Sequence, residues 1–351
     1  MKHILFIKLG AIGDVIQAAA AIEEYRRLNP EVKVDWMVGK AIASLLKEIA
    51  VIDQIIEVPD QGLFSKSPVM RAVALIKIYM KIMPQMRRYE AIYIAHTAWQ
   101  YTLLSIPAYL RNPRLLFTKL RRFYPKLNEY RVSEYSVFLS RQNISSSNGA
   151  LLLQNLGKRL LENNKDLASK LEVDRSKKWV ALIPGGGKNM VRDDCLRRWP
   201  IENYVQLASE LMAQGYSVIL LGGNADEWVK PFFNGMAVKD LIGNTSLVET
   251  VIVMSLANLV ISHDTGPFHL ATLTTSPLIG IFGPTPVTAV APIGREQFTV
   301  FKAPESVKCA PCYDGFGYAP CDNPICMQAS SVLSVLNAAN NLLKGDMVGA
   351  Q

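Results

Sequence analysis

Short apolar runs, each ending in a turn of small or polar residues, recur along this chain. Residues 259–261 read Leu-Val-Ile, and a turn at 262–266 follows them. Uninterrupted apolar runs are typical of buried parallel strands. Pro267 suits the first turn of a helix that would carry His269. A second apolar run at 277–282 completes a predicted strand, turn, helix and strand.

The same pattern predicts further strands in both halves of the chain. They are expected at residues 4–7, 32–38, 54–58, 91–95, 179–183 and 218–221, with helical segments between them. Strands that alternate with helices and end in glycine turns indicate doubly wound parallel sheets. At 351 residues the chain is longer than one core usually supports. We therefore expect two α/β domains, with a linker in the highly charged stretch 165–178.

The formal net charge of +8 favours an anionic partner, such as a nucleotide, a phosphorylated glycan or a membrane surface. No apolar run reaches transmembrane length. The first residues include an apolar run that is too short for a signal peptide and is interrupted by Lys8. We therefore expect a cytoplasmic protein.

The first predicted strand runs into Lys-Leu-Gly-Ala-Ile-Gly-Asp, which ends at Asp14. A dinucleotide fingerprint would need a third glycine, so a nicotinamide site is disfavoured, although Asp35 mimics its ribose-binding acid. Asp14 could lie at the carboxyl edge of the sheet, where open α/β folds bind ligands. Equally, it could only cap the following helix.

Several later turns carry residues suited to binding a phosphorylated ligand. Residues 184–187 are Pro-Gly-Gly-Gly and precede Lys188, but they lack the spacing of a P-loop. Arg197 offers a fixed cation, and Asp226 and Glu227 could accept hydrogen bonds from sugar hydroxyls. Backbone N–H groups near Asp264 could attract a diphosphate; alternatively, Asp264 merely caps its helix.

Basic and aromatic residues alternate over residues 111–131. Such a mixture can contact phosphorylated lipid or an anionic membrane, or it can form a solvated surface with aromatic anchors. Nucleic acid would suit the charge, but no recognised binding motif accompanies it.

Upstream, a helix predicted at 69–88 places Val73, Ile76, Met80 and Met83 on one stripe. His96, at a strand end, could reach a ligand or be structural.

Four of the five cysteines lie close together in sequence: Cys309, Cys312, Cys321 and Cys326. In a reducing compartment such crowding indicates a metal site or free thiols before disulfides. The Cys-x-x-Cys spacing forms half of a common tetrahedral thiolate site for zinc or iron. Reduced structural thiols are the alternative.

Together these motifs resemble a known family. Lys-Leu-Gly-Ala-Ile-Gly-Asp, Pro-Gly-Gly-Gly with Arg-Arg-Trp-Pro, Leu-Gly-Gly-Asn-Ala-Asp-Glu and His-Asp-Thr-Gly-Pro-Phe-His-Leu-Ala occur in that order over nearly the whole chain. The combination resembles the ADP-heptose:lipopolysaccharide heptosyltransferases, glycosyltransferase family 9. The segment around Asp264 is the most specific part of the resemblance.

The resemblance implies a GT-B architecture, in which two Rossmann-like domains face each other across a cleft. It places acceptor binding in residues 1–165 and ADP-sugar donor binding in 166–329, with a final helix in 330–351 crossing back to the first domain. Asp14 matches the catalytic base. Arg197 falls where many members carry a phosphate-contacting lysine, and these two cations differ in geometry. The implied donor-binding residues are Lys188, Arg197, Asp226, Glu227, Asp264, Thr265, Gly266, Pro267 and His269. The acceptor-side candidates are Gly13, His96, Arg121 and Arg122.

The implied reaction is inverting transfer of heptose from ADP-heptose to a sugar hydroxyl of the lipopolysaccharide inner core or lipid A. It needs no metal for catalysis, and it implies peripheral contact with the cytoplasmic face of the inner membrane. Two alternatives remain open: a GT-B transferase or epimerase with a UDP-type donor, and a non-catalytic nucleotide-sugar binding protein. The acceptor sugar, the linkage, the donor sugar and the oligomeric state are not defined by the sequence.

Overall fold

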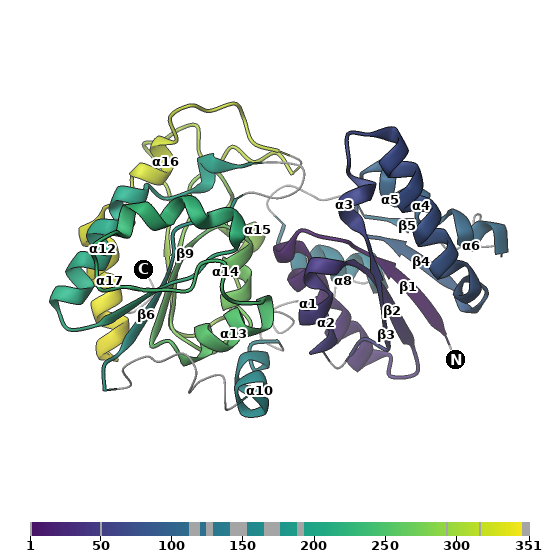
Figure 1. The fold of residues 1–351 in the computed structure, drawn as a ribbon, viewed down its shortest axis with the longest axis horizontal. Coiled ribbons are helices and arrows are strands. Elements are labelled where there is room, and N and C mark those ends of the chain that lie inside the picture. Colours follow the sequence, from purple (N-terminus) through teal and green to yellow (C-terminus); the bar gives the residue numbers. More distant parts are fainter. Residues whose placement is uncertain are drawn as a thin grey trace. The chain divides into compact units, whose positions relative to one another are not determined.

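The computed structural model describes residues 2–49, 51–111, 120–123, 129–140, 153–164, 176–187, 193–292, 294–315 and 317–345; the side chains of 108, 109, 111 and 120–122 are outside this description. The chain divides into two compact units (Figure 1). Unit 1 comprises Met1–Lys126 with Arg131–Leu152, and unit 2 comprises Leu127–Tyr130 with Leu153–Gln351.

The described elements of unit 1 are β1 (His3–Ile7), α1 (Ile12–Leu28), β2 (Lys33–Gly39), α2 (Lys40–Lys47), β3 (Gln54–Val58), α3 (Asp60–Leu63), α4 (Pro68–Ile82), the 3-10 helix η1 (Met83–Arg88), β4 (Ala91–Ile94), α5 (Trp99–Leu103), α6 (Ile106–Arg111), β5 (Leu120–Arg122) and α8 (Arg131–Ser140). Those of unit 2 are α10 (Leu156–Asn163), β6 (Trp179–Ile183), η2 (Cys195–Arg197), α12 (Ile201–Ala213), β7 (Ser217–Leu220), η3 (Asn224–Phe233), β8 (Lys239–Asp240), α13 (Leu247–Leu256), β9 (Leu259–His263), α14 (Gly266–Ala271), β10 (Leu278–Ile281), α15 (Val287–Val290), β11 (Phe298–Phe301), α16 (Ile325–Gln328) and α17 (Val332–Lys344).

The sheet of unit 1 has the strand order β3-β2-β1-β4-β5, and every pair is parallel. Strand order reverses between β1 and β4, so the loops that follow these two strands flank the switch point where open α/β sheets bind ligands. The residues after β1 lead to Asp14, and those after β4 lead to His96. The topology therefore brings two of the predicted site residues to one edge of this sheet.

The sheet of unit 2 has the order β11-β10-β9-β6-β7-β8, again with every pair parallel. This is the order of a complete Rossmann fold, and unit 1 has the same order with five strands. In unit 2 the reversal lies between β6 and β9. The glycine turn at 184–187 and the turn at Asp264 and Thr265 therefore flank one switch point. The expectation of two Rossmann-like sheets is confirmed.

Helices cover both faces of each sheet (Figure 1). In unit 1, α1 packs on α8, while Ile78 and Ile82 of α4 join a core with Leu5 and Ile7 of β1. In unit 2, α12 and α17 pack together and share a core with β6, β7 and β9. Among the described residues, no helix has the length and apolar character needed to cross a membrane.

The division between the units differs from the expected boundary at residue 165. The main part of unit 2 begins at Leu153 because α10 packs on α13, within that unit. The final helix, α17, packs on α12, β9 and β10 of the same unit, and Val335 lies in its core. The described part of the last segment therefore belongs to unit 2; its crossing back to the first unit stays a prediction.

Candidate active site

Asp14 lies in the first turn of α1 and does not cap that helix. The capping position is Ala11, which makes no side-chain cap hydrogen bond. The carboxylate of Asp14 instead accepts a hydrogen bond from the ammonium group of Lys8, with 2.8 Å between Nζ and Oδ2. The Asp14 side chain remains 40% exposed. Of the two interpretations of this loop, the structure excludes capping and leaves an accessible carboxylate at the sheet edge.

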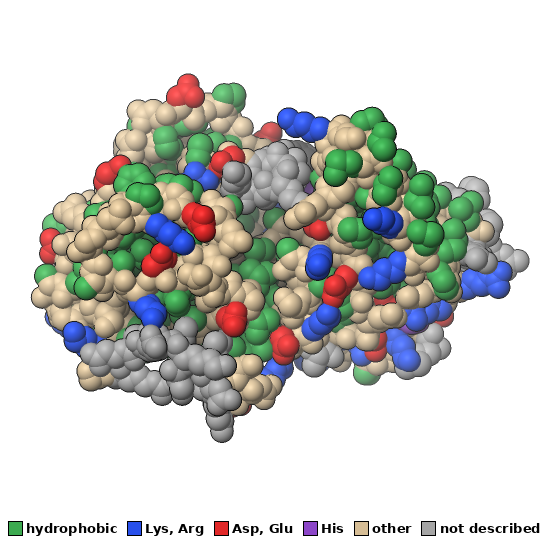
Figure 2. Space-filling view, in the orientation of Figure 1, with side chains coloured by type: hydrophobic (Ala, Val, Ile, Leu, Met, Phe, Trp, Pro, Cys, Tyr) green, Lys and Arg blue, Asp and Glu red, His purple; other side chains and the backbone are tan. Residues whose placement is uncertain are grey.

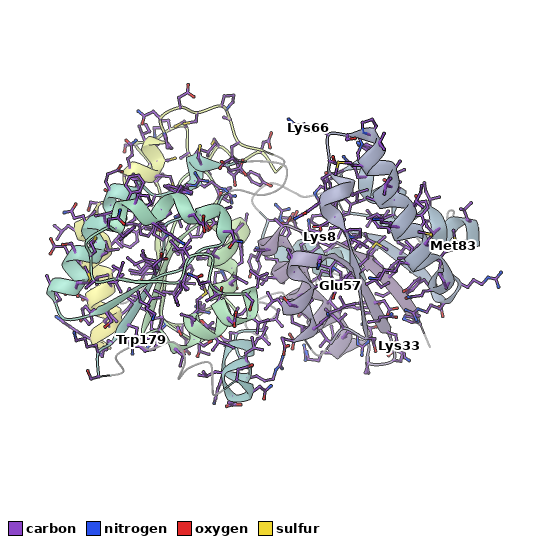
Figure 3. All side chains as sticks on the ribbon, in the orientation of Figure 1. Lys8, Lys33, Glu57, Lys66, Met83 and Trp179 are labelled. Atoms are coloured by element: carbon purple, nitrogen blue, oxygen red, sulfur yellow. The ribbon has the colours of Figure 1, made fainter. Side chains whose placement is uncertain are left out.

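Lys8 is the buried partner that keeps Asp14 charged (Figure 3). Its backbone is fixed because its N–H donates to the Met37 carbonyl and its own carbonyl accepts from the Trp36 indole. Burial raises the pKa of Asp14, but the charges of Lys8, Arg131 and His96 together outweigh that effect. The pKa of Asp14 therefore lies below its usual value of 3.8, and the carboxylate is ionised at neutral pH.

The acceptor-side candidates have different surroundings. Gly13 is buried within α1. The His96 ring stacks on the Tyr101 ring with 4.3 Å between centroids, and its Nδ1 accepts from the Ala98 N–H. His96 is thus held near Asp14 and contributes to its low pKa. Arg121 and Arg122 lie on β5, but their side chains are outside the described part of the chain.

Asp35, in the position of a dinucleotide-binding acid, is already engaged. Its carboxylate accepts from the Tyr89 hydroxyl at 2.7 Å and pairs with Arg88 and with His3. The side chain is 1% exposed. These contacts make Asp35 a structural residue, which agrees with the incomplete glycine pattern and disfavours a nicotinamide site.

In unit 2 the buried carboxylate of Asp226 joins two glycine turns. Its Oδ1 accepts from the Gly186 N–H at 2.7 Å, and its Oδ2 accepts from the Gly223 N–H at 2.8 Å. Both oxygens are therefore used by the protein backbone. The adjacent Glu227 side chain is 65% exposed and lies 3.7 Å from the ammonium group of Lys230. Of the two acids, Glu227 is the one available to a sugar hydroxyl.

Partly exposed Arg197 and buried Asp264 form a pair after β6 and β9. The guanidinium Nη1 donates to the Asp264 carbonyl at 3.0 Å and lies 3.5 Å from the carboxylate Oδ2. Burial lowers the pKa of Arg197, but the charges of Asp264, Tyr318 and Asp194 raise it by a larger amount. The pKa therefore lies above its usual value, and the side chain stays cationic. Among the described residues, its Nε has no hydrogen-bond partner. The structure thus holds a cation with unused donor capacity at the switch point.

The turn beyond Asp264 begins α14, whose capping residue is Thr265 and not Asp264. Gly266 and Pro267 occupy the first two helical positions. His269 is buried, with Nε2 4.0 Å from Asp264 Oδ1. Because α14 spans only six residues, its dipole contributes less than sequence reasoning assumed. Arg197 supplies a full positive charge here. Lys188, the remaining donor-side candidate, lies outside the described residues.

Tyr318, in the cysteine-rich segment 309–326, contacts Arg197 at the switch point of unit 2. The Tyr318 ring lies against the Arg197 guanidinium, 5.6 Å from carbon to centroid, and its hydroxyl is 3.0 Å from that of Thr285. No group of three or more His, Cys, Asp or Glu side chains in the described chain is arranged to hold a metal ion. Burial raises the pKa of Cys326, and Cys312, Cys309 and Cys321 are near enough to raise it further.

Sequence reasoning did not identify Lys8, Arg131, Tyr318 or His263 as parts of these sites. Lys8 had a local signal, because a lysine at the end of an apolar strand must find a partner when buried. The other three had none. Arg131 pairs with Glu134 at 2.5 Å. His263 bonds to Tyr204 at 3.0 Å, with its pKa lowered to about 3 by burial and by Arg197 and Arg198. Tyr318 and His263 depend on contacts between distant segments, and Arg131 acts on Asp14 from more than a hundred residues away.

Comparison with known proteins agrees with this geometry. The family model described as glycosyltransferase family 9 (heptosyltransferase) matches residues 152–314. The lipooligosaccharide heptosyltransferase 2 of Haemophilus influenzae is 34% identical over 96 residues, covering 25% of this chain and 28% of the relative. The lipopolysaccharide heptosyltransferase 1 of Escherichia coli O18:K1:H7 is 23% identical over 310 residues, covering 86% of this chain and 92% of the relative.

Solved structures show the same fold. The family 9 glycosyltransferase of Veillonella parvula superposes with a TM-score of 0.74 at 19% identity, covering 98% of this chain and 97% of the other. The ADP-heptose lipopolysaccharide heptosyltransferase II of E. coli has a TM-score of 0.68 at 17% identity, covering 99% of both chains. The chain thus has the two Rossmann-like units of the GT-B fold, and its residues 152–314 match the model of glycosyltransferase family 9.

Proposed function

We propose that this protein transfers heptose from ADP-heptose to a sugar hydroxyl of the lipopolysaccharide inner core, with inversion at the anomeric carbon. Relatives named as heptosyltransferases support the transferred sugar and the acceptor class. The observation that carries the proposal is the ionised, partly exposed carboxylate of Asp14, held by buried Lys8 at the sheet edge.

In this mechanism unit 1 supplies the base, and unit 2 binds the donor. Asp14 accepts the proton of the acceptor hydroxyl as that oxygen attacks the anomeric carbon, and the carbon–oxygen bond to ADP breaks on the opposite face. The transition state resembles an oxocarbenium ion, while negative charge grows on the diphosphate. Arg197, cationic and partly exposed, is suited to stabilise that charge. Backbone N–H groups at Thr265 and Gly266 add donors, and Glu227 is suited to the ribose.

The test is transfer from ADP-heptose to a lipid-free core oligosaccharide. Asp14→Asn keeps the size of the side chain but removes the base, so we expect transfer to fall about 10²–10⁴-fold while ADP binding changes little. Arg197→Ala removes charge-assisted bonds to the diphosphate and should weaken ADP binding about ten- to a hundredfold. Full activity of the Asp14 variant would refute the base assignment. Stronger thermal stabilisation by UDP than by ADP would refute the assignment of an ADP-linked sugar as the donor.

Because Arg197 supplies the positive charge, we infer that transfer needs no divalent cation. Protein treated with EDTA should therefore keep its rate, and a loss restored by Mg²⁺ would contradict this part of the mechanism.

We also propose that the four cysteines hold a structural zinc or iron ion. The three thiols that raise the pKa of Cys326 support this proposal. The described side chains are not arranged to hold a metal as they stand, so the thiols would have to move closer together. No step of the reaction depends on this ion. Metal analysis of the purified protein tests the proposal, and less than about a tenth of an equivalent counts against it.

Finally, an acceptor that is anchored in a membrane requires the enzyme to work at a membrane surface. We therefore propose peripheral association with the cytoplasmic face of the inner membrane, driven by the positive net charge. Fractionation of cells that express the protein tests this: recovery with washed membranes at low salt, and release at high salt, is the expected result.

A further inference from the structure

Helix α4 carries apolar side chains on two opposite sides. Its inner side places Ala74, Ile78 and Ile82 in the core of unit 1. Its outer side exposes Val69, Val73, Ile76 and Met80, with exposed fractions of 70%, 46%, 57% and 67%. These four residues follow the spacing i, i+4, i+7 and i+11 and therefore form one continuous stripe on the helix. We name them the outer stripe.

An apolar stripe on a helix ordinarily faces a core, and scattered exposed apolar residues need no explanation. The outer stripe is neither buried nor scattered. Figure 2 shows a run of green side chains on unit 1 where Figure 1 places α4, with blue side chains beside it. The four exposed apolar side chains of the outer stripe are suited to contact a partner that is itself apolar.

The charged residues of the segment that carries the outer stripe are all basic. No carboxylate occurs between Asp60 and Glu90, whereas this segment contains six basic residues: Lys66, Arg71, Lys77, Lys81, Arg87 and Arg88. Lys77 and Lys81 are exposed and directly follow Ile76 and Met80 in sequence. The ammonium group of Lys81 also donates to the Glu57 carbonyl at 2.7 Å, and its charge lowers the pKa of the Glu57 carboxyl. Lys66 is exposed in the loop between α3 and α4 (Figure 3). The partner must therefore be anionic as well as apolar.

A second copy of the chain fits these charges poorly. A twofold contact would place the same stripe and the same lysines opposite each other, with no acid in the segment to neutralise them. An anionic lipid surface instead offers acyl chains to the stripe and negative headgroups to the lysines.

We propose that the outer stripe of α4, with Lys77 and Lys81, docks unit 1 onto an anionic lipid bilayer. The helix would lie in the interface with its outer side toward the acyl chains. This inference rests on the proposed function for its purpose, because docking brings the enzyme to a lipid-anchored acceptor. It identifies α4 as the membrane contact, whereas the sequence offered residues 111–131 as either a membrane contact or a solvated surface.

The experiment measures binding of the full-length protein to vesicles of phosphatidylglycerol and phosphatidylcholine, compared with phosphatidylcholine alone. We expect Ile76→Ser combined with Met80→Ser to weaken binding about tenfold or more. Lys77→Gln and Lys81→Gln should each weaken it about fivefold, and added salt should weaken it further. Leu333→Ser is the matched control, because Leu333 is 66% exposed on α17 in unit 2. It should leave binding unchanged.

Three outcomes would overturn the inference. The α4 variants could bind anionic vesicles as tightly as the unaltered protein, or the protein could bind neutral vesicles equally well. In the third, sedimentation velocity would show a dimer that the stripe variants dissociate, so that a second copy of the chain would be the partner of the outer stripe.

Transfer to a lipid-free acceptor separates this inference from the proposed function. If the variants lose vesicle binding and keep that transfer, both stand; if the unaltered protein binds vesicles but transfers nothing, only the function falls.

Discussion

Replacing Lys8 with methionine tests whether the buried lysine controls the catalytic carboxylate. Methionine has a similar length and tolerates burial, so the variant should fold. It removes the ammonium group that lies 2.8 Å from Asp14 Oδ2. In the unaltered protein the pKa of Asp14 is below 3.8; without Lys8, the burial that raises this pKa is opposed only by more distant charges.

The size of the effect follows from the distance and the exposure. Two unit charges 2.8 Å apart interact by roughly 6 kcal/mol at an effective dielectric constant of about 20. Asp14 is 40% exposed, so water screens much of that energy. Removal of a close opposite charge commonly shifts a carboxyl pKa by about 1–3 units. Because Arg131 and His96 remain, we expect the pKa of Asp14 to rise by about 1–2 units.

The assay is the pH dependence of kcat/KM for transfer. The acid limb of the profile should move to higher pH by about 1–2 units, while activity at pH 8 stays well above that of Asp14→Asn. Lys47→Met is the control, since it breaks an exposed ion pair with Glu57 in the same unit and should leave the acid limb in place. A folded Lys8 variant whose acid limb coincides with that of the unaltered protein would refute the reasoning.

The sign for stability follows from the same pKa. Because the folded-state pKa of Asp14 is below 3.8, its pairing stabilises the fold above pH 3.8 and is lost as the pH falls through the folded-state value. The Lys8 variant should show less of this acid destabilisation.

Three further predictions concern unit 2. Asp226→Asn places an amide nitrogen against a backbone N–H and should lower the free energy of unfolding by about 2–4 kcal/mol; an unchanged urea midpoint would contradict the bridging role. Gly186→Ala should lower the free energy of unfolding by about 2 kcal/mol more than Gly215→Ala does. Both glycines have positive φ, but only at Gly186 would a Cβ lie 2.9 Å from Thr265. Equal losses of unfolding free energy in urea would show that this close approach is unimportant. The pKa of His263 falls from 6.5 to about 3 on folding, so stability should be full above pH 6.5 and decrease by a few kcal/mol as the pH falls toward 3. His263→Leu should reduce that slope in urea unfolding at a series of pH values, and an unaltered slope would assign it to other groups.

The amino-acid pattern was sufficient to predict the two parallel sheets. Short apolar runs such as 259–261 are typical of buried strands, and the turns of small residues that follow them mark where they end. Since carboxyl ends of parallel strands share one edge, the pattern also placed Asp14 and Asp264 at ligand-binding edges. These inferences needed only local information.

Tertiary structure decided which chemistry each residue is free to perform. Whether Asp226 or Glu227 is available depends on the amides of Gly186 and Gly223, and the Gly186 amide meets the carboxylate only when the loops after β6 and β7 converge. The contact of Tyr318 with Arg197 joins segments more than a hundred residues apart. Periodicity identified the stripe on α4, but a helix that is apolar on two sides does not specify which side packs. That choice follows from the shape of the rest of the core, which no local pattern contains.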